Sequence, residues 1–217
     1  MLLACEALSS TRVQEATPVF RRLFKAFGLP PRLRPDTGVP CATNTLARLS
    51  QLSARWVHLG LRPECIDPGT PHQNGRHERR HRPLNADTTR PPGANLRARP
   101  RQFTHVREEL NHERPHEALD RHTPAACDAP SPRKMPHKLP PLAYPDRFAV
   151  RDGRAHGGIR WHHHGVNVSH TGVGEDVGLE EIDDGVWHIY FGPLNLGRLL
   201  ERHRRIADVY GRLKRHG

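Results

Sequence analysis

The sequence lacks long hydrophobic runs and has few hydrophobic residues overall. They make up 35% of the 217 residues, below the roughly 45–50% of an ordinary globular chain, and no run approaches the ~20 apolar residues of a membrane-spanning helix. We therefore expect a modest core and no membrane partner. The four cysteines lie far apart and form no Cys-x-x-Cys pair. This argues against a zinc site and a disulfide framework, and favours a reducing, cytoplasmic location.

Lysine is also scarce, because 30 of the 34 basic residues are Arg. Arg favours planar, bidentate phosphate contacts, and a net charge of +11 with a pI near 10.5 indicates nucleic acid as the partner. Residues 72–107 alone hold nine Arg against two acids, Glu78 and Asp87. This segment predicts a groove that follows a DNA backbone without reading sequence. A solvated basic face is the alternative.

The stretch Gln73-Asn74-Gly75-Arg76-His77-Glu78-Arg79 is the most informative in the chain. Pro and Gly just ahead of it end the preceding element, and Asn74 can cap a helix that carries Glu78 about one turn inside. Glu78 then either forms a surface ion pair with Arg82 at i+4, or is a metal ligand beside a phosphate track.

Two further pieces accompany this stretch. Upstream, Arg34-Pro35-Asp36 has the form of a strand ending on an aspartate, and downstream lies Asn111-His112-Glu113-Arg114-Pro115-His116. In this order the three pieces resemble the catalytic core of insertion-sequence transposases related to retroviral integrases, which carry an Asp, Asp, Glu triad on an α/β, ribonuclease-H-like fold. Asp36 matches the second Asp and Glu78 the Glu, with 41 residues between them.

The resemblance implies DNA integration or transposition with a Mg²⁺ (or Mn²⁺) cofactor held by Asp36 and Glu78, since hard cations need carboxylate oxygens. DNA is the expected partner. A homo-oligomer is compatible with the resemblance, and the sequence leaves the oligomeric state open. The residues expected to contact DNA are Arg76, Arg79, Arg80, Arg82, Arg97, Arg99 and Arg101.

The first carboxylate of the triad has no match. Residues 1–35 contain no Asp and two acids, Glu6 and Glu15, neither at a matching position. Thr37 also departs from the Asn that usually follows the second Asp. We therefore expect a ribonuclease-H-like core that lacks its first strands and is catalytically impaired. The alternative is a non-enzymatic DNA-binding or multimerising transposase remnant.

Periodicity predicts the elements of the first half. Phe20, Leu23, Phe24 and Phe27 mark a helix over residues 13–27, ended by Gly28. The other expected elements are a buried strand at 2–8, a strand containing Leu33, a helix through Leu46, Leu49 and Leu52 capped by Thr43 or Asn44, a strand at 61–66 and a helix at 96–110.

The second half changes character after a proline-rich linker at 128–145. Short β runs at 147–150, 158–161, 166–169, 177–182 and 186–191 predict a small SH3-like barrel, with Asp184-Gly185 as a hairpin turn. A basic tail, expected to be helical, covers 199–216. The predicted segments are a catalytic core at 1–127, the linker at 128–145, the barrel at 146–197 and the tail at 198–217.

Three smaller predictions concern side chains. His162, His163 and His164 invite a metal site, but consecutive strand residues point to opposite faces, which argues against one. Residues 151–192 hold seven acids against three bases, so the barrel suits a protein-facing or assembly role better than DNA. Arg114 and His116 are expected to be structural.

Overall fold

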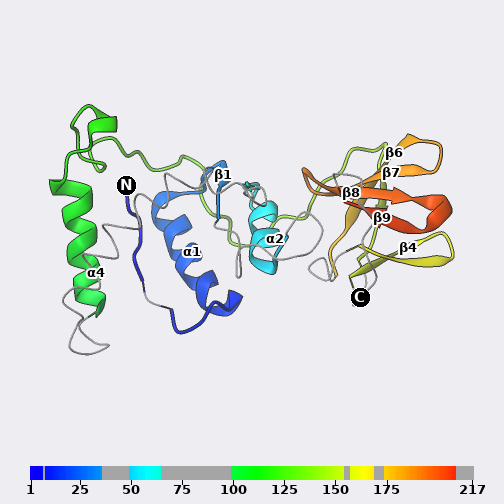
Figure 1. Ribbon diagram of the computed structural model, residues 1–217, viewed down its shortest axis with the longest axis horizontal. Coiled ribbons are helices and arrows are strands. Elements are labelled where there is room, and N and C mark those ends of the chain that lie inside the picture. The colour runs from blue at the N-terminus through cyan, green and yellow to red at the C-terminus, as the bar shows by residue number, and fades with distance from the viewer. Residues whose placement is uncertain (7, 36–48, 65–98, 154–156, 169–173, 209–217) are drawn as a thin grey trace. The chain divides into compact units, whose positions relative to one another are not determined.

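The computed structural model describes residues 1–6, 8–35, 49–64, 99–153, 157–168 and 174–208 (Figure 1). They form two compact units, the first within Met1–Leu29 and Ile66–Met135, the second within Pro30–Cys65 and Pro136–Gly217. The described chain combines helices with a five-stranded antiparallel sheet, a parallel strand pair and a hairpin, so the predicted mixed α/β class is confirmed. The predicted segments are 1–127, 128–145, 146–197 and 198–217. They place residues 30–65 with the catalytic core, whereas the two units place these residues with 136–217. The predicted division stays a prediction.

Helix α1 spans Val13–Phe27, as its apolar stripe predicts. Ala16 and Phe24 are buried, and the rings of Phe20 and Phe24 lie 5.9 Å apart. Gly28 ends the helix with φ +77°, a left-handed conformation that costs glycine little. Its amide donates to the carbonyl of Phe24 at 3.0 Å.

The N-terminal segment is not a strand, so the prediction of a buried strand at 2–8 is wrong over its described residues. The backbone of Leu2 is instead held by a side chain of the same unit. Its amide donates to Asn111 Oδ1 at 2.7 Å, and Asn111 Nδ2 donates to its carbonyl at 2.8 Å. The Asn111 amide thus satisfies the groups that a neighbouring strand would have bonded.

Strands β1 (Arg32–Leu33) and β2 (Arg62–Pro63) pair in parallel within the second unit. The Arg62 amide donates to the carbonyl of Pro31 at 3.0 Å, and the Glu64 amide to that of Leu33 at 2.8 Å. A parallel pair needs a crossover between its strands, and α2 lies in that connection. The predicted alternation of strand, helix and strand is therefore present.

Helix α2 spans Gln51–His58 and begins later than predicted. Its cap is Ser50, whose hydroxyl accepts from the Ser53 amide at 3.1 Å while Ser53 Oγ accepts from the Ser50 amide at 2.7 Å. This reciprocal capping box satisfies two helix-end donors, so the expected cap at Thr43 or Asn44 is wrong for this helix. Those two residues lie outside the described residues.

Helix α4 spans Arg99–Glu108 and continues into a π-helical segment at Glu109–Glu113. This agrees with the helix expected at 96–110 over its described part. Val106 and Asn111 are buried here, at 4% and 5% exposure.

Among the described helices, none is both long enough and apolar enough to cross a membrane.

The five-stranded antiparallel sheet has the order β3-β6-β7-β8-β9, with a separate hairpin β4–β5 (Figure 1). Its core side chains alternate along the strands, with Leu179, Ile189 and Leu199 fully buried. The bounds are β3 Ala149–Arg151, β4 Gly158–Trp161, β5 His164–Asn167, β6 Val177–Asp183, β7 Val186–Phe191, β8 Leu194–Leu200 and β9 Arg205–Ala207. All five predicted β runs are therefore strands, with bounds shifted by up to two residues.

Two-residue turns join the central strands. Asp183 pairs with Val186 across the predicted Asp184-Gly185 turn. Phe191 pairs with Leu194 across Gly192-Pro193, and φ at Gly192 is +53°. A positive φ followed by proline, whose ring excludes positive φ, is the pattern of a type II′ turn. This second hairpin was missed by the sequence analysis although Gly-Pro signals it.

The prediction of a helical tail from residue 199 is wrong over its described part. Leu199 and Leu200 belong to β8, and Ile206 lies in β9 opposite Leu199. Leu196, Leu199 and Leu200 have the spacing of a helix face, but β8 has partners on both sides and buries Leu196 and Leu199 in the core. Tertiary pairing therefore overrides the local pattern.

The predicted linker at 128–145 contains no helix or strand, and its last ten residues, 136–145, belong to the second unit. Leu142 lies against the core cluster, which joins Ala54 and Val57 of α2 to the strands. The Tyr144 hydroxyl donates to the carbonyl of Asp176 at 2.7 Å and accepts from the Gly192 amide at 3.1 Å.

Candidate functional site

Most of the predicted site lies outside the described residues. Asp36 and Glu78, the expected metal ligands, are both in this group. So are five of the seven arginines expected to contact DNA, namely Arg76, Arg79, Arg80, Arg82 and Arg97. What the structure describes is the framework on either side of them.

The strand that leads to Asp36 is fixed by an ion pair that the sequence analysis missed. Glu64, just past the end of β2, accepts from Arg32 at 3.0 Å and from Arg34 at 2.9 Å. The guanidinium groups of Arg34 and then Arg32 lower the pKa of the Glu64 carboxyl. Because parallel strands end at the same edge, Glu64 ties the carboxyl end of β1 to that of β2 close to Asp36 in sequence. An acidic residue in one predicted strand opposite basic residues in the neighbouring predicted strand is the sequence signal that could have revealed these ion pairs.

The two acids of residues 1–35 are both engaged in structural contacts. Glu6 pairs with Arg22. Glu15 accepts from the hydroxyls of Ser9 and Ser10, each at 2.7 Å, and from their amides at 2.8 and 3.1 Å. The hydrogen bonds from Ser10 and then Ser9 lower its pKa to about 2. Glu15 thus orders the entry to α1.

Arg99 and Arg101 lie on α4, and the side chain of Arg101 is exposed. His105, one turn further on, is exposed as well. Arg107, by contrast, forms an ion pair with Glu108 at 2.7 Å. Arg101 is therefore placed where a polyanion could reach it.

The segment Asn111–His116 has an architectural role. Besides holding Leu2, Asn111 accepts through its carbonyl from the Ala125 amide at 3.0 Å. Arg114 donates through Nε to Glu109 Oε1 at 3.0 Å, with Nη2 at 2.8 Å. The His116 amide donates to the carbonyl of His122 at 3.1 Å. These contacts support the prediction that Arg114 and His116 are structural, with Arg114 bound to the Glu109 carboxylate.

The histidines at 162–164 sit at a hairpin tip rather than along one strand. Trp161 pairs with His164, so His162 and His163 form the turn, with φ +49° at His162. His162 Nε2 lies 2.9 Å from Glu201 Oε1. Among the described residues, no group of three His, Cys, Asp or Glu side chains is placed to hold a metal ion.

A polar contact joins α2 to the β strands. His58, with 10% of its side chain exposed, has Nδ1 2.8 Å from the carbonyl of Pro140 and Nε2 2.9 Å from Glu175 Oε2. A carbonyl only accepts, so Nδ1 is the donor in the contact with Pro140. The imidazole ring of His58 therefore bridges the linker carbonyl and the Glu175 carboxyl group.

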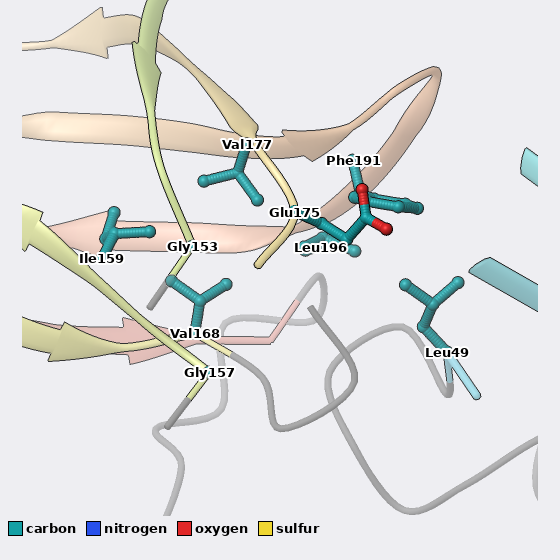
Figure 2. A pocket seen from close by; sticks show the side chains of 9 residues that line it. All are labelled: Leu49, Gly153, Gly157, Ile159, Val168, Glu175, Val177, Phe191 and Leu196. Atoms are coloured by element: carbon teal, nitrogen blue, oxygen red, sulfur yellow. The ribbon is translucent and has the colours of Figure 1, made fainter. Parts of the chain in front are cut away.

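The described pocket next to this contact is apolar (Figure 2). Leu49 stands at one end and Ile159 at the other, with Glu175 as the one ionisable side chain in the lining. His58 already engages that carboxylate. A substrate site needs several convergent polar groups, so this pocket is a feature of packing. Its lining residues are Leu49, Gly153, Gly157, Ile159, Val168, Glu175, Val177, Phe191 and Leu196.

Comparison with known families gives a match over residues 59–124, to the family described as the integrase core domain. The matched stretch holds Glu78, all seven arginines expected to contact DNA, and the Asn111–His116 segment, whereas Asp36 precedes it. It confirms the predicted resemblance to an integrase or transposase catalytic core over these residues.

Among solved structures, the chain is similar to one chain of the cryo-EM structure of the simian T-cell lymphotropic virus intasome in complex with the PP2A regulatory subunit B56 gamma. The identity is 12% and the TM-score 0.45. The similarity covers 88% of this chain and 65% of that one.

Proposed function

We propose that this chain acts in DNA integration or transposition, as an integrase-type core that binds DNA through its Arg-rich segment. The observation that carries the proposal is the integrase core match at residues 59–124, which encloses Glu78 and all nine arginines of 72–107. In this proposal the α/β part is a ribonuclease-H-like core, and the strands β3 to β9 form an SH3-like module.

The donor set fits a hard divalent cation. Asp36 and Glu78 offer carboxylate oxygens, which Mg²⁺ and Mn²⁺ prefer over nitrogen or sulfur ligands. When bound, such ions supply charge stabilisation at a scissile phosphate. Within the described residues, the Glu64 ion pairs hold Arg32 and Arg34, which come shortly before Asp36 in the sequence.

We further propose that the 217 residues alone do not cut or join DNA. A two-metal site needs its full ligand set, and the two acids in residues 1–35 serve other contacts, Glu6 with Arg22 and Glu15 with Ser9 and Ser10. A non-enzymatic, DNA-binding or multimerising role is the second candidate, and the incomplete carboxylate set favours it.

Strand transfer of a labelled DNA end with Mg²⁺ or Mn²⁺ tests this. We expect no product from the 217-residue protein, and product once an N-terminal extension supplies an Asp on a paired strand. In the extended protein, Glu78→Gln should abolish activity, while Glu113→Gln, an exposed acid outside the proposed ligand set, should not. Activity from the 217-residue protein that disappears in Asp36→Asn would refute the proposal.

DNA binding is tested separately by its salt dependence. If about six phosphates are contacted, affinity should fall roughly 10³-fold between about 50 and 200 mM salt. Replacing Arg76, Arg79 and Arg80 by Ala should reduce the slope of log K against log salt by about 0.9 for each lost phosphate contact. Arg202→Ala, at an exposed position of the second unit, is the matched control. Affinity that stays flat with salt would contradict DNA binding.

A further inference from the structure

One face of the five-stranded sheet is aromatic, and it is the face opposite the core. The core side of β6 and β7 carries Leu179 and Ile189, both fully buried. The neighbouring pair Gly178 and Tyr190 therefore belongs to the opposite face, and the Tyr190 side chain points away from the core. The Phe148 ring lies 5.2 Å from that of Tyr190 and 6.4 Å from that of Tyr144. We call the surface formed by Tyr144, Phe148, His188 and Tyr190 the aromatic face.

The aromatic face is ordered before any partner binds. A Cβ added at Gly178 would lie 2.4 Å from Tyr144 Cδ1 and 2.7 Å from Phe148 Cδ2, so both rings rest directly on the backbone. The Tyr144 hydroxyl is bonded to two backbone groups. Val150, which pairs with Gly178 on the neighbouring strand, is 41% exposed beside these rings. Rigid Tyr and Phe rings next to an exposed aliphatic side chain are typical of protein interfaces.

A row of charge crosses the same face. Glu180, His188 and Arg198 are directly paired across β6, β7 and β8. Arg198 Nε donates to His188 Nε2 at 3.2 Å. The row therefore has a carboxylate at one end, an imidazole in the middle, and a guanidinium at the other end.

Such a row is complementary to itself. A two-fold axis running along β7 above His188 turns the face onto a second copy and reverses the row. Each end lies about 5 Å from the centre, so Glu180 then faces Arg198 of the partner subunit, and Arg198 faces Glu180 of the partner subunit. Two-fold contacts require this self-complementarity. Glu180 already accepts from Arg147 at 2.9 Å, but an ionised carboxylate has room for a second donor.

We propose that the aromatic face is a self-association surface that binds a second copy of this chain. A nucleic acid is disfavoured as the occupant, because Glu180 lies within the face and residues 151–192 carry seven acids against three bases. The inference stands apart from the proposed DNA chemistry, since it needs neither Asp36 nor Glu78.

Sedimentation velocity of the full chain without DNA, at about 0.15 M salt, tests the surface. In a symmetric pair, Glu180→Arg creates two Arg–Arg contacts and Arg198→Glu creates two Glu–Glu contacts. Each variant alone should dissociate more readily, by on the order of 100-fold. An equimolar mixture of the two should associate again, because both contacts become opposite in sign, and the double variant in one chain should do so too.

Glu181→Arg is the matched control. It makes the same charge change on the adjacent, exposed residue of β6, which points to the other face, and should leave association unchanged. A wild-type chain that remains monomeric would overturn the proposal, as would a dimer that ignores both charge reversals. Folded single variants that dissociate but do not associate again when mixed would also overturn it, because the mixture restores opposite charges at both contacts.

Discussion

Asn111 should control the attachment of the N-terminal segment. Its side chain is 5% exposed and makes two hydrogen bonds to the backbone of Leu2. Each is worth about 1 kcal/mol net, so Asn111→Ala should weaken the attachment by about 2 kcal/mol. At 1.4 kcal/mol per factor of ten, the detached population should rise about 30-fold.

Cys5 provides the assay. Burial, and then the nearby Glu6 charge, raise the pKa of its thiol, and the thiolate is the reactive form. Detachment exposes Cys5 and returns its pKa toward the ordinary value, so alkylation should accelerate in Asn111→Ala. Cys127, which is exposed in the same unit, serves as the internal reference. Peptide mass mapping follows both thiols at once.

Two further variants sharpen the result. Asn111→Asp keeps the shape but cannot donate to the Leu2 carbonyl when ionised, so at neutral pH it should also accelerate alkylation of Cys5. Glu113→Gln changes an exposed acid in the same segment and should have no effect. An unchanged Cys5 rate in Asn111→Ala, with Cys127 also unchanged, would show that the two hydrogen bonds do not hold the segment.

Three other perturbations follow from the structure. The pKa of Glu15 is lowered to about 2, so its contribution to folding is complete above its ordinary value of 4.5 and lost as pH falls toward 2; Glu15→Gln should remove that part of the acid sensitivity in a pH titration of unfolding. Burial, then Asp152 and Glu175, raise the pKa of Asp176, so its ionised form opposes folding as pH rises through that pKa. Asp176→Asn should therefore raise the melting temperature at pH 7 but not near pH 3. The control Glu181→Gln should leave the melting temperature unchanged at both pH values. Pro18 lies inside α1, where proline costs up to about 3 kcal/mol; Pro18→Ala should therefore shift urea unfolding of the first unit to higher concentration, and an unchanged midpoint would contradict this.

The sequence by itself determined the elements whose signals are local. The Phe20, Leu23, Phe24 stripe with Gly28 places both ends of α1 correctly, and β4 and β7 have the predicted bounds. The Asp184-Gly185 turn forms because its backbone needs are met within two residues. The resemblance carried by Glu78 and the Asn111–His116 segment is confirmed by the match at 59–124, while the ligand roles of Asp36 and Glu78 stay predictions.

Tertiary structure decided what depends on partners distant in the chain. Residues 2–6 are apolar enough for a strand, but the Asn111 side chain, more than 100 residues away, takes the backbone groups of Leu2. Leu196 and Leu199 have helical spacing, yet pairing on both sides makes them β8. Glu64 gains its role from two arginines 30 or more residues earlier. In each case the deciding contact joins groups that local propensity does not couple, so a pattern read along the chain could not foresee it.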